Sequence, residues 1–259
     1  MAHETVLITG ASSGIGRELA KCFAADGCCL VLVARRGSAL ESLAGELRKN
    51  HRVDARVVVA DLAETEAPTR IMGQLQHHGL KVDVLVNNAG FGAQGRFTEL
   101  PLERQLEMIQ VNVTALTHLT RLLLPDMIKR GRGGILNVAS TAAFQPGPYM
   151  AVYYASKAYV LSWSEALAEE IVGTGVVVTA LCPGPTETAF ADAARMKDSL
   201  LFKMSRMSAS TVAESGHRAF RQGRALAVPG LRNRMLAFCV RFSPRWMVRR
   251  VAATLNRGR

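Results

Sequence analysis

Short runs of apolar residues alternate along the chain with longer amphipathic stretches. The short runs predict β-strands, and most are continuously apolar, as in a sheet that is covered on both faces. They are Thr5–Thr9, Cys28–Ala34, Ala55–Ala60, Val82–Val86, Gly134–Ser140, Val176–Cys182 and Ala225–Val228. The amphipathic stretches predict helices over Gly14–Ala25, Ser38–Lys49, Glu64–Gln76, Leu102–Lys129, Tyr149–Gly173 and Thr211–Gln222. Strand–helix repetition at this spacing predicts a doubly wound parallel α/β sheet of about seven strands.

The chain fits one large domain followed by an extension of different composition. It has 259 residues, of which 49% are hydrophobic, enough for a well-buried core. We expect an α/β domain over residues 1–230 and a helical extension over residues 231–259. Pro244 divides the extension into two amphipathic stretches. One carries Leu231, Met235, Phe238, Cys239 and Phe242 on a single face, and the other carries Met247, Val251 and Leu255.

The net charge of +11 belongs to the C-terminal part of the chain. From Ser199 onward there are thirteen Lys and Arg residues and one acid, and residues 231–259 hold eight arginines and no acid. Two interpretations of this extension stay open. Its apolar faces pack on the domain or on a second subunit, or its helices lie on an anionic membrane surface. A nucleic-acid partner is not expected, because the sequence has no recognisable nucleic-acid-reading module.

The cysteine and histidine patterns argue against disulfides and metal sites. The five cysteines lack the spacing of a disulfide framework, and neither they nor the six histidines show metal-ligand spacing. No apolar run is long enough to span a bilayer, and a strand-like run begins too near the N-terminus to leave room for a signal peptide. We therefore expect a cytoplasmic protein without a metal, associated with membranes at most peripherally.

A glycine-rich stretch, TGASSGIG, follows the first predicted strand and opens the first predicted helix. The residues expected to hold a ligand here are Gly10, Ser12, Ser13, Gly14, Ile15 and Gly16. Residues without Cβ let the backbone approach a pyrophosphate closely, and a helix N-terminus offers free N–H groups to phosphates. In this strand–loop–helix context the stretch predicts dinucleotide binding.

The end of the second predicted strand indicates which dinucleotide is bound. An acidic residue there would bind the ribose 2′-hydroxyl of NAD, but Ala34, Arg35 and Arg36 occupy the region. Guanidinium groups pair well with a 2′-phosphate, so we expect a preference for NADP(H). Arg35 is the stronger candidate because it is closer to the strand end. The alternative is that both arginines are solvated surface residues.

Residues 147–160, GPYMAVYYASKAYV, place two tyrosines one helical turn before a lysine. Tyr153 lies four residues before Lys157 and Tyr154 lies three, so helix geometry alone barely distinguishes them. A phenol has a pKa of ~10 in model peptides, and a neighbouring ammonium together with the positive nicotinamide ring would stabilise the phenolate and lower that pKa. We therefore expect a phenol that serves in acid–base chemistry. Ser140, which ends an apolar strand, is expected to orient a reacting carbonyl.

Six motifs together resemble those of the short-chain dehydrogenase/reductase family, with matches from Thr9 to about Thr188. They are TGASSGIG, ADL at Ala60–Leu62, NNAG at Asn87–Gly90, VNV at Val111–Val113, Ser140 with the Tyr153–Lys157 pair, and PGPTET at Pro183–Thr188. The resemblance implies a Rossmann-type fold. It also makes Tyr153 the catalytic tyrosine, because the family serine lies thirteen positions earlier, where this chain has Ser140.

The resemblance implies roles for the residues of these motifs. Tyr153 exchanges the proton and Ser140 orients the carbonyl. Lys157 tunes the phenol and holds the ribose, and Asn112 positions a water that links Lys157 to solvent. The cofactor is contacted by Asp61, Leu62, Asn88, Ala89, Gly90, Pro183, Gly184, Thr186 and Thr188. For Asp61, capping of the next helix is the alternative.

These observations favour an NADP(H)-dependent oxidoreductase that interconverts a ketone or aldehyde and its alcohol. The resemblance implies a homodimer or homotetramer that pairs through the two longest predicted helices. It also implies that residues 189–209, rich in Met, Phe and Leu, form a substrate lid, which favours a bulky apolar substrate. Ordinary helix packing is the alternative for that segment. The alternative function is a catalytically silent NADP(H)-binding scaffold protein.

Overall fold

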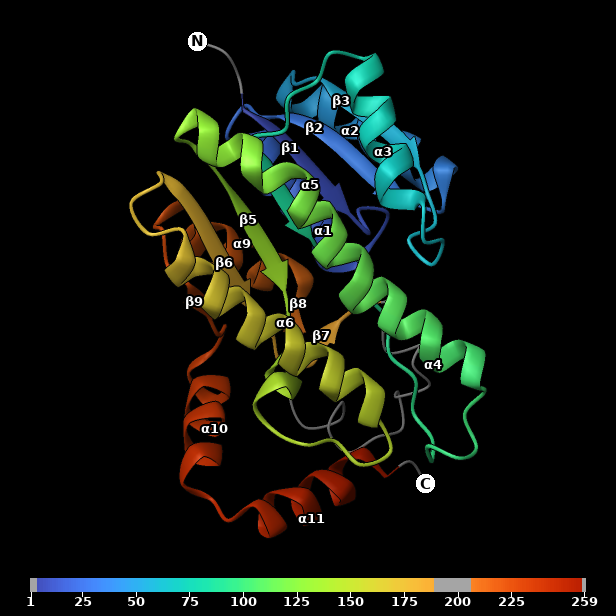
Figure 1. Ribbon diagram of the computed structural model, residues 1–259, viewed down its shortest axis with the longest axis vertical. Helices are drawn as coiled ribbons and strands as arrows, with labels where there is room; N and C mark the ends of the chain where they lie inside the picture. Colours follow the sequence, from blue (N-terminus) through green and yellow to red (C-terminus); the bar gives the residue numbers. More distant parts are fainter. Residues whose placement is uncertain (1–3, 189–205, 258–259) are drawn as a thin grey trace.

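A computed structural model describes residues 4–188 and 206–257 of the chain. Within these residues, seven parallel strands form the central sheet, in the order β3-β2-β1-β4-β5-β6-β9 (Figure 1). The strands are β1 (Thr5–Thr9), β2 (Cys29–Ala34), β3 (Ala55–Val59), β4 (Val84–Asn87), β5 (Gly133–Val138), β6 (Val176–Leu181) and β9 (Leu226–Ala227). Each corresponds to one predicted strand, so the predicted doubly wound sheet is confirmed.

Helices cover both faces of the sheet, which explains why its strands are continuously apolar. One face carries α1 (Gly14–Ala25), α2 (Gly37–His51) and α9 (Ala209–Arg221), and the other carries α3 (Ala67–His77), α5 (Ala115–Arg130) and α6 (Ala151–Glu170). The first layer buries Phe23 and the second buries Ile71 against the strands. Figure 1 views the molecule from the side of α5 and α6.

The predicted helix Leu102–Lys129 is interrupted. The structure has α4 (Leu102–Ile109), a π-helical turn η1 (Gln110–Thr114), and then α5. Asn112 lies in this wider turn and is buried, with its side-chain amide bonded to the backbone N and O of Phe91. Such turns occur mostly at functional sites, and this one brings Asn112 against the loop that follows β4.

The predicted helix Tyr149–Gly173 begins two residues later than expected, because α6 starts at Ala151. Tyr149 has φ +65, a left-handed conformation that a right-handed helix does not contain. The segment before α6 is therefore a shaped loop, which lies beside the candidate site described below.

The C-terminal extension forms α10 (Leu231–Phe242) and α11 (Arg245–Asn256), separated at Pro244 as predicted. Against the described part of the domain, the apolar face of α10 and most of that of α11 do not pack, although packing was one of the two open interpretations. α10 buries none of its residues, and α11 packs through Val248, Ala252 and Asn256, leaving Val251 54% exposed. Among the helices of the described residues, none is both long enough and apolar enough to cross a membrane. Figure 1 shows α10 and α11 at the lower end of the molecule, beyond the central sheet.

Candidate active site

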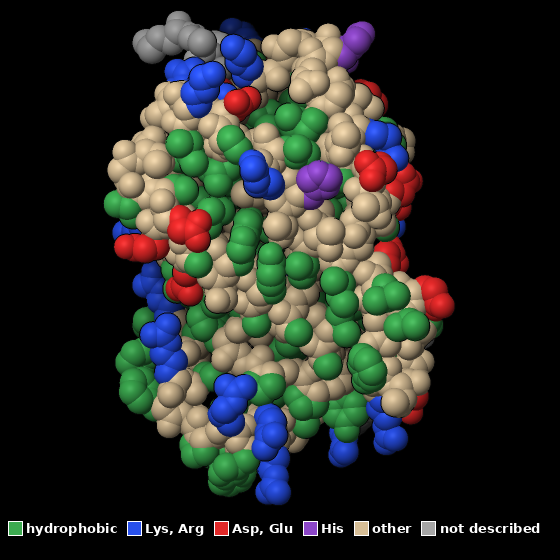
Figure 2. All heavy atoms as spheres, in the orientation of Figure 1, with side chains coloured by type: hydrophobic (Ala, Val, Ile, Leu, Met, Phe, Trp, Pro, Cys, Tyr) green, Lys and Arg blue, Asp and Glu red, His purple; other side chains and the backbone are tan. Residues whose placement is uncertain are grey.

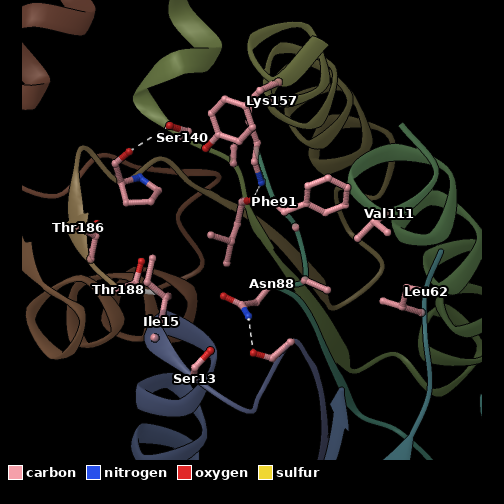
Figure 3. Close-up of a pocket in the computed structure, with 18 of the residues that line it drawn as sticks. Ser13, Ile15, Leu62, Asn88, Phe91, Val111, Ser140, Lys157, Thr186 and Thr188 are labelled. Atoms are coloured by element: carbon pink, nitrogen blue, oxygen red, sulfur yellow. Dashed lines mark hydrogen bonds between the residues drawn. The ribbon is translucent and has the colours of Figure 1, made fainter. Parts of the chain in front are cut away.

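A cavity of about 540 Å³ lies at the carboxyl ends of the strands, where the strand order reverses between β1 and β4. It brings together almost all of the predicted site residues. Its lining includes Gly10, Ser12, Ser13, Gly14, Ile15, Arg35, Arg36, Asp61, Leu62, Asn88, Ala89, Gly90, Ser140, Tyr153, Lys157, Pro183, Gly184, Thr186 and Thr188. Figure 3 shows residues from the first loop, the β4 loop and α6 around this common space. Gly16 and Asn112 are predicted site residues that do not line it.

The loop between β1 and α1 forms one wall of the cavity. Gly10 and Gly14 have φ +64 and +55, in the left-handed region that favours glycine. A Cβ on Gly14 would lie 2.9 Å from Thr188 Cγ2, so a side chain there would close the gap between two walls. The N-cap of α1, Ser13, makes no side-chain cap hydrogen bond, which leaves the first N–H groups of the helix available to a ligand.

Gly16 affects this loop through packing and does not itself line the cavity. A Cβ there would collide with Asn88 Nδ2 and would lie 2.6 Å from Gly10 O. The missing side chain allows Asn88 Nδ2 to donate to Thr9 O at 2.8 Å and to Gly10 O at 3.2 Å. Gly16 therefore shapes the loop through close packing, and the residue that lines the cavity at this point is Asn88.

The two arginines after β2 occupy different surroundings. Arg36 Nη2 donates to Ser12 Oγ at 3.1 Å, which joins it to the glycine-rich loop. Arg35 Nη1 lies 3.7 Å from Asp61 Oδ2 and 3.8 Å from Glu107 Oε1, between two carboxylates. The sequence favoured Arg35 on its closeness to the strand end, but Arg36 is the arginine that contacts the loop expected to hold phosphates.

Ser140 and Tyr153 both line the cavity, and the serine hydroxyl is close enough to the phenol to lower its pKa. Ser140 follows β5, and its Oγ accepts from Ala142 N at 3.1 Å and lies 3.4 Å from Pro183 O (Figure 3). Thr141 N donates to the same carbonyl at 2.8 Å, so the loops after β5 and β6 are joined at this point. The serine hydroxyl is thus held in place beside the phenol.

The hydroxyl groups of the two neighbouring tyrosines have different partners. The Tyr153 hydroxyl interacts with Ser140, which lowers its pKa, whereas the Tyr154 hydroxyl donates to Asn256 Oδ1 of α11 at 3.1 Å. Both rings line the cavity, and their planes are inclined at 78°. Helix spacing alone left the two nearly tied, and the structure distinguishes them: Tyr153 belongs with the serine and Tyr154 with the C-terminal helix.

Lys157 is buried with its Nζ 2.7 Å from Val138 O and 6.0 Å from the centre of the Tyr153 ring. Burial lowers the pKa of Lys157 to about 8. Burial also raises the pKa of Tyr153, and the hydrogen bond with Ser140 opposes this rise only in part. In the protein alone, desolvation of the phenolate dominates, and the expected lowering of this pKa by the ammonium together with a nicotinamide ring stays a prediction. The phenol stays protonated at neutral pH.

Asn112 lies behind the cavity wall and next to Lys157. Its Nδ2 donates to Phe91 O and to Ser156 Oγ, each at 3.0 Å, and its Oδ1 accepts from Phe91 N at 3.1 Å. A Cβ on Gly90 would lie 3.0 Å from Asn112 Oδ1 and 3.4 Å from Lys157 Nζ. The missing side chain of Gly90 thus leaves room for both polar groups, of which Lys157 lines the cavity and Asn112 does not. The water-positioning role of Asn112 stays a prediction.

Comparison with known proteins identifies the family. A family model described as short chain dehydrogenase matches residues 4–199 of the chain. The chain belongs to the short-chain dehydrogenase family. It is 37% identical over 184 residues to a ketoacyl reductase of Nostoc sp., a match that covers 71% of this chain and 64% of that protein. Matches to the first curated relatives span between 58% and 64% of those proteins' own lengths, so the relatives are longer than the part they share with this chain.

Two solved short-chain dehydrogenases are similar over nearly the whole chain. A short-chain dehydrogenase from Sphingobium yanoikuyae in complex with NADPH has 33% identity and a TM-score of 0.83, covering 91% of this chain and 92% of that one. The bulky-bulky ketone specific alcohol dehydrogenase from Comamonas testosteroni has 29% identity and a TM-score of 0.79, covering 93% of this chain and 94% of that one. The predicted family is confirmed.

The cofactor that a short-chain dehydrogenase implies is a nicotinamide dinucleotide, and the residues of this cavity fit one. The glycine-rich loop leaves space that a Cβ on Gly10 or Gly14 would fill. The open N-terminus of α1 suits a pyrophosphate, and Arg36 next to Ser12 suits an anionic group on the ribose.

Sequence reasoning missed a second group of cavity residues and the one residue of α11 that supports them. The missed lining residues include Phe91, Val111, Gln145, Met150 and Tyr154. Asn256 is fully buried, and it donates from Nδ2 to Pro148 O at 3.1 Å and accepts from Tyr154 and from Gln94. One signal was available: Val248, Ala252 and Asn256 recur every four residues, so the asparagine lies on the buried stripe of α11.

We expect Asn256→Ala to loosen the cavity wall. The Tyr154 hydroxyl would lose its acceptor and Pro148 O its donor, and leaving a buried polar group unpaired costs about 1–3 kcal/mol. For a chain of this size the melting temperature should fall by roughly 2–4 °C per kcal/mol. Thermal unfolding measures this, with the exposed Thr254→Ala as the matched control on the same helix. A double variant with Tyr154→Phe should lose less than the sum of the two single losses. Additive losses would contradict the contact.

Proposed function

We propose that this short-chain dehydrogenase is an NADP(H)-dependent oxidoreductase that interconverts a ketone or aldehyde and its alcohol. The observation that carries the proposal is the convergence of Ser140, Tyr153 and Lys157 in one cavity that also contains the glycine-rich loop. A cavity that only bound a dinucleotide would need the loop but not these three side chains.

Reduction of a carbonyl forms a C–H bond and an O–H bond while the C=O π bond breaks. A dinucleotide held by the glycine-rich loop would supply the hydride that reaches carbon. Tyr153 gives its hydroxyl proton to the oxygen, and Ser140 donates a hydrogen bond that holds the oxygen within reach of the phenol. Lys157 is one turn from Tyr153, where its ammonium stabilises the phenolate that forms. In the oxidative direction each of these transfers is reversed.

The protonation states of Tyr153 and Lys157 at neutral pH favour the reductive direction. Burial raises the pKa of Tyr153, so at neutral pH the phenol carries the proton that reduction needs. Lys157, whose pKa burial lowers to about 8, is still mostly protonated at pH 7. A protonated acid beside a protonated lysine is the starting state for protonating a carbonyl oxygen.

The preference for NADP(H) is proposed from Arg36 and Arg35. Neither β2 nor the residues that follow it offer a carboxylate for a ribose 2′-hydroxyl, and Arg36 lies against Ser12. Hydrogen bonds to charged groups are worth about 1.5–3 kcal/mol. We expect Arg36→Ala to lower kcat/KM for NADPH about tenfold or more and to leave kcat/KM for NADH almost unchanged.

Steady-state kinetics with both cofactors measures this selectivity. Lys49→Ala, which removes an exposed cation from the other end of α2, is the matched control and should change neither value. Arg35→Ala is expected to have a smaller effect than Arg36→Ala, because Arg35 is shared between Asp61 and Glu107. Equal losses for NADH and NADPH in the Arg36 variant would contradict the assignment.

The substrate is proposed to be lipophilic. On the Ser140 side the cavity is lined by Phe91, Ala142, Met150 and Tyr154, which are mostly apolar. The names of two similar proteins, the Nostoc ketoacyl reductase and the Comamonas testosteroni alcohol dehydrogenase, refer to a ketoacyl group and to bulky ketones. The predicted lid over residues 189–209 lies almost entirely outside the described residues, so the proposal rests on the cavity wall.

The test of the proposed function is a screen of NADPH oxidation over lipophilic ketones and aldehydes, with Tyr153→Phe measured in parallel. Turnover of at least one carbonyl by the wild type and loss of that turnover in the variant are expected. Tight NADPH binding without turnover on any substrate would instead favour the catalytically silent scaffold.

Self-association is also part of the proposal. Leu102, Leu106 and Ile109 of α4 are 60%, 55% and 41% exposed, and Tyr159 of α6 is 38% exposed. Apolar side chains at this exposure on neighbouring helices are typical of a surface that a second copy covers. Analytical ultracentrifugation should find a dimer or tetramer, and Leu106→Glu should shift it toward the monomer.

A further inference from the structure

The helix α10 presents apolar side chains to solvent along its whole length. Leu231, Met235, Phe238 and Phe242 are 72%, 60%, 61% and 74% exposed, and no residue of the helix is buried. At 3.6 residues per turn these four lie on one stripe. Exposing such a stripe to water is unfavourable, and within residues 4–188 and 206–257 nothing buries it.

Exposed apolar side chains are also present on α11. Trp246, Met247 and Val251 are 56%, 40% and 54% exposed. The opposite side of α11 packs on the domain through Val248 and Ala252, which fixes the orientation of the exposed side chains. We call the exposed residues of α10 and α11 together the tail surface.

Arginines border the tail surface on both helices. Helical geometry sets Arg234 and Arg241 on one side of the α10 stripe and Arg232 on the other. No arginine within the described residues 231–257 makes an ion pair, and the extension contains no acid. Figure 2 shows Lys and Arg side chains beside hydrophobic ones along the lower edge, where Figure 1 places these helices.

The exposed Trp246 lies beside an arginine of the same helix. Arg250 Cζ lies 5.5 Å from the centre of the Trp246 ring, a cation–π distance. Aromatic rings that pair with cations suit the boundary between headgroups and acyl chains, where one part of the ring is apolar and the other is wet.

We propose that the tail surface docks the protein on an anionic lipid bilayer, with α10 and α11 lying in the plane of the interface. The apolar stripe enters the acyl boundary and the flanking arginines bind anionic headgroups, the arrangement of an interfacial amphipathic helix. Helices of 12 residues each are long enough to lie on a membrane but not to cross it.

A second copy of the chain fits this surface less well. A symmetric contact brings the same patch of two subunits together, which would set arginines against arginines with no acid in residues 231–259 to pair them. The exposed residues of α4 and α6 lack this accumulation of charge and are the better surface for self-association. A polyanion such as nucleic acid would pair the arginines but leave Phe238 and Phe242 in water.

Flotation of the full chain with lipid vesicles tests the proposal. Vesicles of phosphatidylcholine alone are compared with vesicles of equal parts phosphatidylcholine and phosphatidylglycerol. We expect flotation with the anionic vesicles only, and release from them at high salt because exposed charges are screened. Binding needs no substrate or turnover, so its failure is distinguishable from failure of the proposed activity.

Two variants separate the apolar and the charged contributions. One variant combines Phe238→Ser and Phe242→Ser and removes two aromatic side chains from the stripe. The other combines Arg241→Gln, Arg245→Gln and Arg249→Gln and removes three cations. Each variant should lower the partition coefficient between vesicles and water. We expect a decrease of about a hundredfold for the arginine variant, because each basic residue near an anionic surface contributes about 1 kcal/mol. Phe97→Ser, which removes a 63% exposed phenylalanine elsewhere, is the matched control and should bind as the wild type does.

Three results would overturn the proposal. One is absence of flotation with the anionic vesicles. Another is equal flotation of the wild type and both tail variants. The third is a wild type that does not bind vesicles, together with a phenylalanine variant that sediments as a monomer where the wild type sediments as a dimer. That result would assign the surface to a second copy of this chain. Since all the substituted side chains are exposed, unchanged thermal unfolding checks that the variants fold.

Discussion

Tyr153→Phe is expected to lower kcat for carbonyl reduction by about a thousandfold, within the range typical of a general acid. The substitution removes only the hydroxyl that lies near Ser140 and leaves the ring packed in the cavity wall. Binding of NADPH should change little, because the loop between β1 and α1 is untouched. Steady-state kinetics gives the first quantity, and fluorescence titration with NADPH gives the second.

Tyr154→Phe is the matched control. It removes a buried hydroxyl from the adjacent residue of the same helix, so a general effect of deleting a phenol oxygen from α6 would appear in both variants. We expect it to keep kcat within a fewfold and to lower the melting temperature, since its hydroxyl bonds to Asn256 and not to Ser140. The reverse pattern, with turnover lost in Tyr154→Phe and kept in Tyr153→Phe, would contradict the assignment.

The strands and most helices were predictable because local sequence carries their signal. A parallel sheet covered on both faces demands continuous apolar runs, and Thr5–Thr9 and Val176–Leu181 stand out in the sequence for that reason. The glycine-rich loop was predictable on similar grounds, because the left-handed conformations of Gly10 and Gly14 restrict the residue type.

The remaining features depend on contacts between distant segments, which local patterns do not encode. Residues 102–129 have helical periodicity throughout, and the wide turn at Asn112 arises from its bonds to Phe91, twenty-one positions earlier. Asn256 reaches Tyr154 over a separation of 102 residues. The exposed stripe of α10 was visible as an amphipathic pattern, but only the structure determines which side of such a helix meets the domain.

The electrostatics of the pair on α6 also required the structure. Spacing alone suggested that Lys157 makes Tyr153 more acidic, because an ammonium one turn away attracts a phenolate. The spacing says nothing about burial, which here disfavours the charged form of both groups. The two groups also have different neighbours. The Tyr153 phenol lies near the hydroxyl of Ser140, and the Lys157 ammonium donates to the carbonyl of Val138. In the protein alone, desolvation and not the neighbouring ammonium therefore determines the direction in which the pKa of Tyr153 shifts.

Lys157→Met is expected to have the second-largest effect on turnover, lowering kcat/KM at pH 7 by about a hundredfold or more. The thioether is similar in length to the lysine side chain but cannot stabilise a phenolate. In the wild type, reduction should weaken as the pH rises through about 8, because the ammonium of Lys157 is lost there. The variant should lack this decline, since no group remains to titrate in that range at this position. Lys49→Met, which removes an exposed lysine, should keep both the rate and the pH profile.

Stability provides an independent readout of the same group. The folded-state pKa of Lys157, about 8, is below its ordinary value of 10.5, so between these values the unfolded chain binds a proton that the folded chain does not. Unfolding free energy should therefore rise with pH from about 8 to 10.5, and Lys157→Met should remove this rise. At pH 7 the variant no longer buries a cation, so we expect its melting temperature to equal or exceed that of the wild type while its turnover is lost. A variant that is both less stable and equally pH-dependent would mean that Lys157 is not the titrating group.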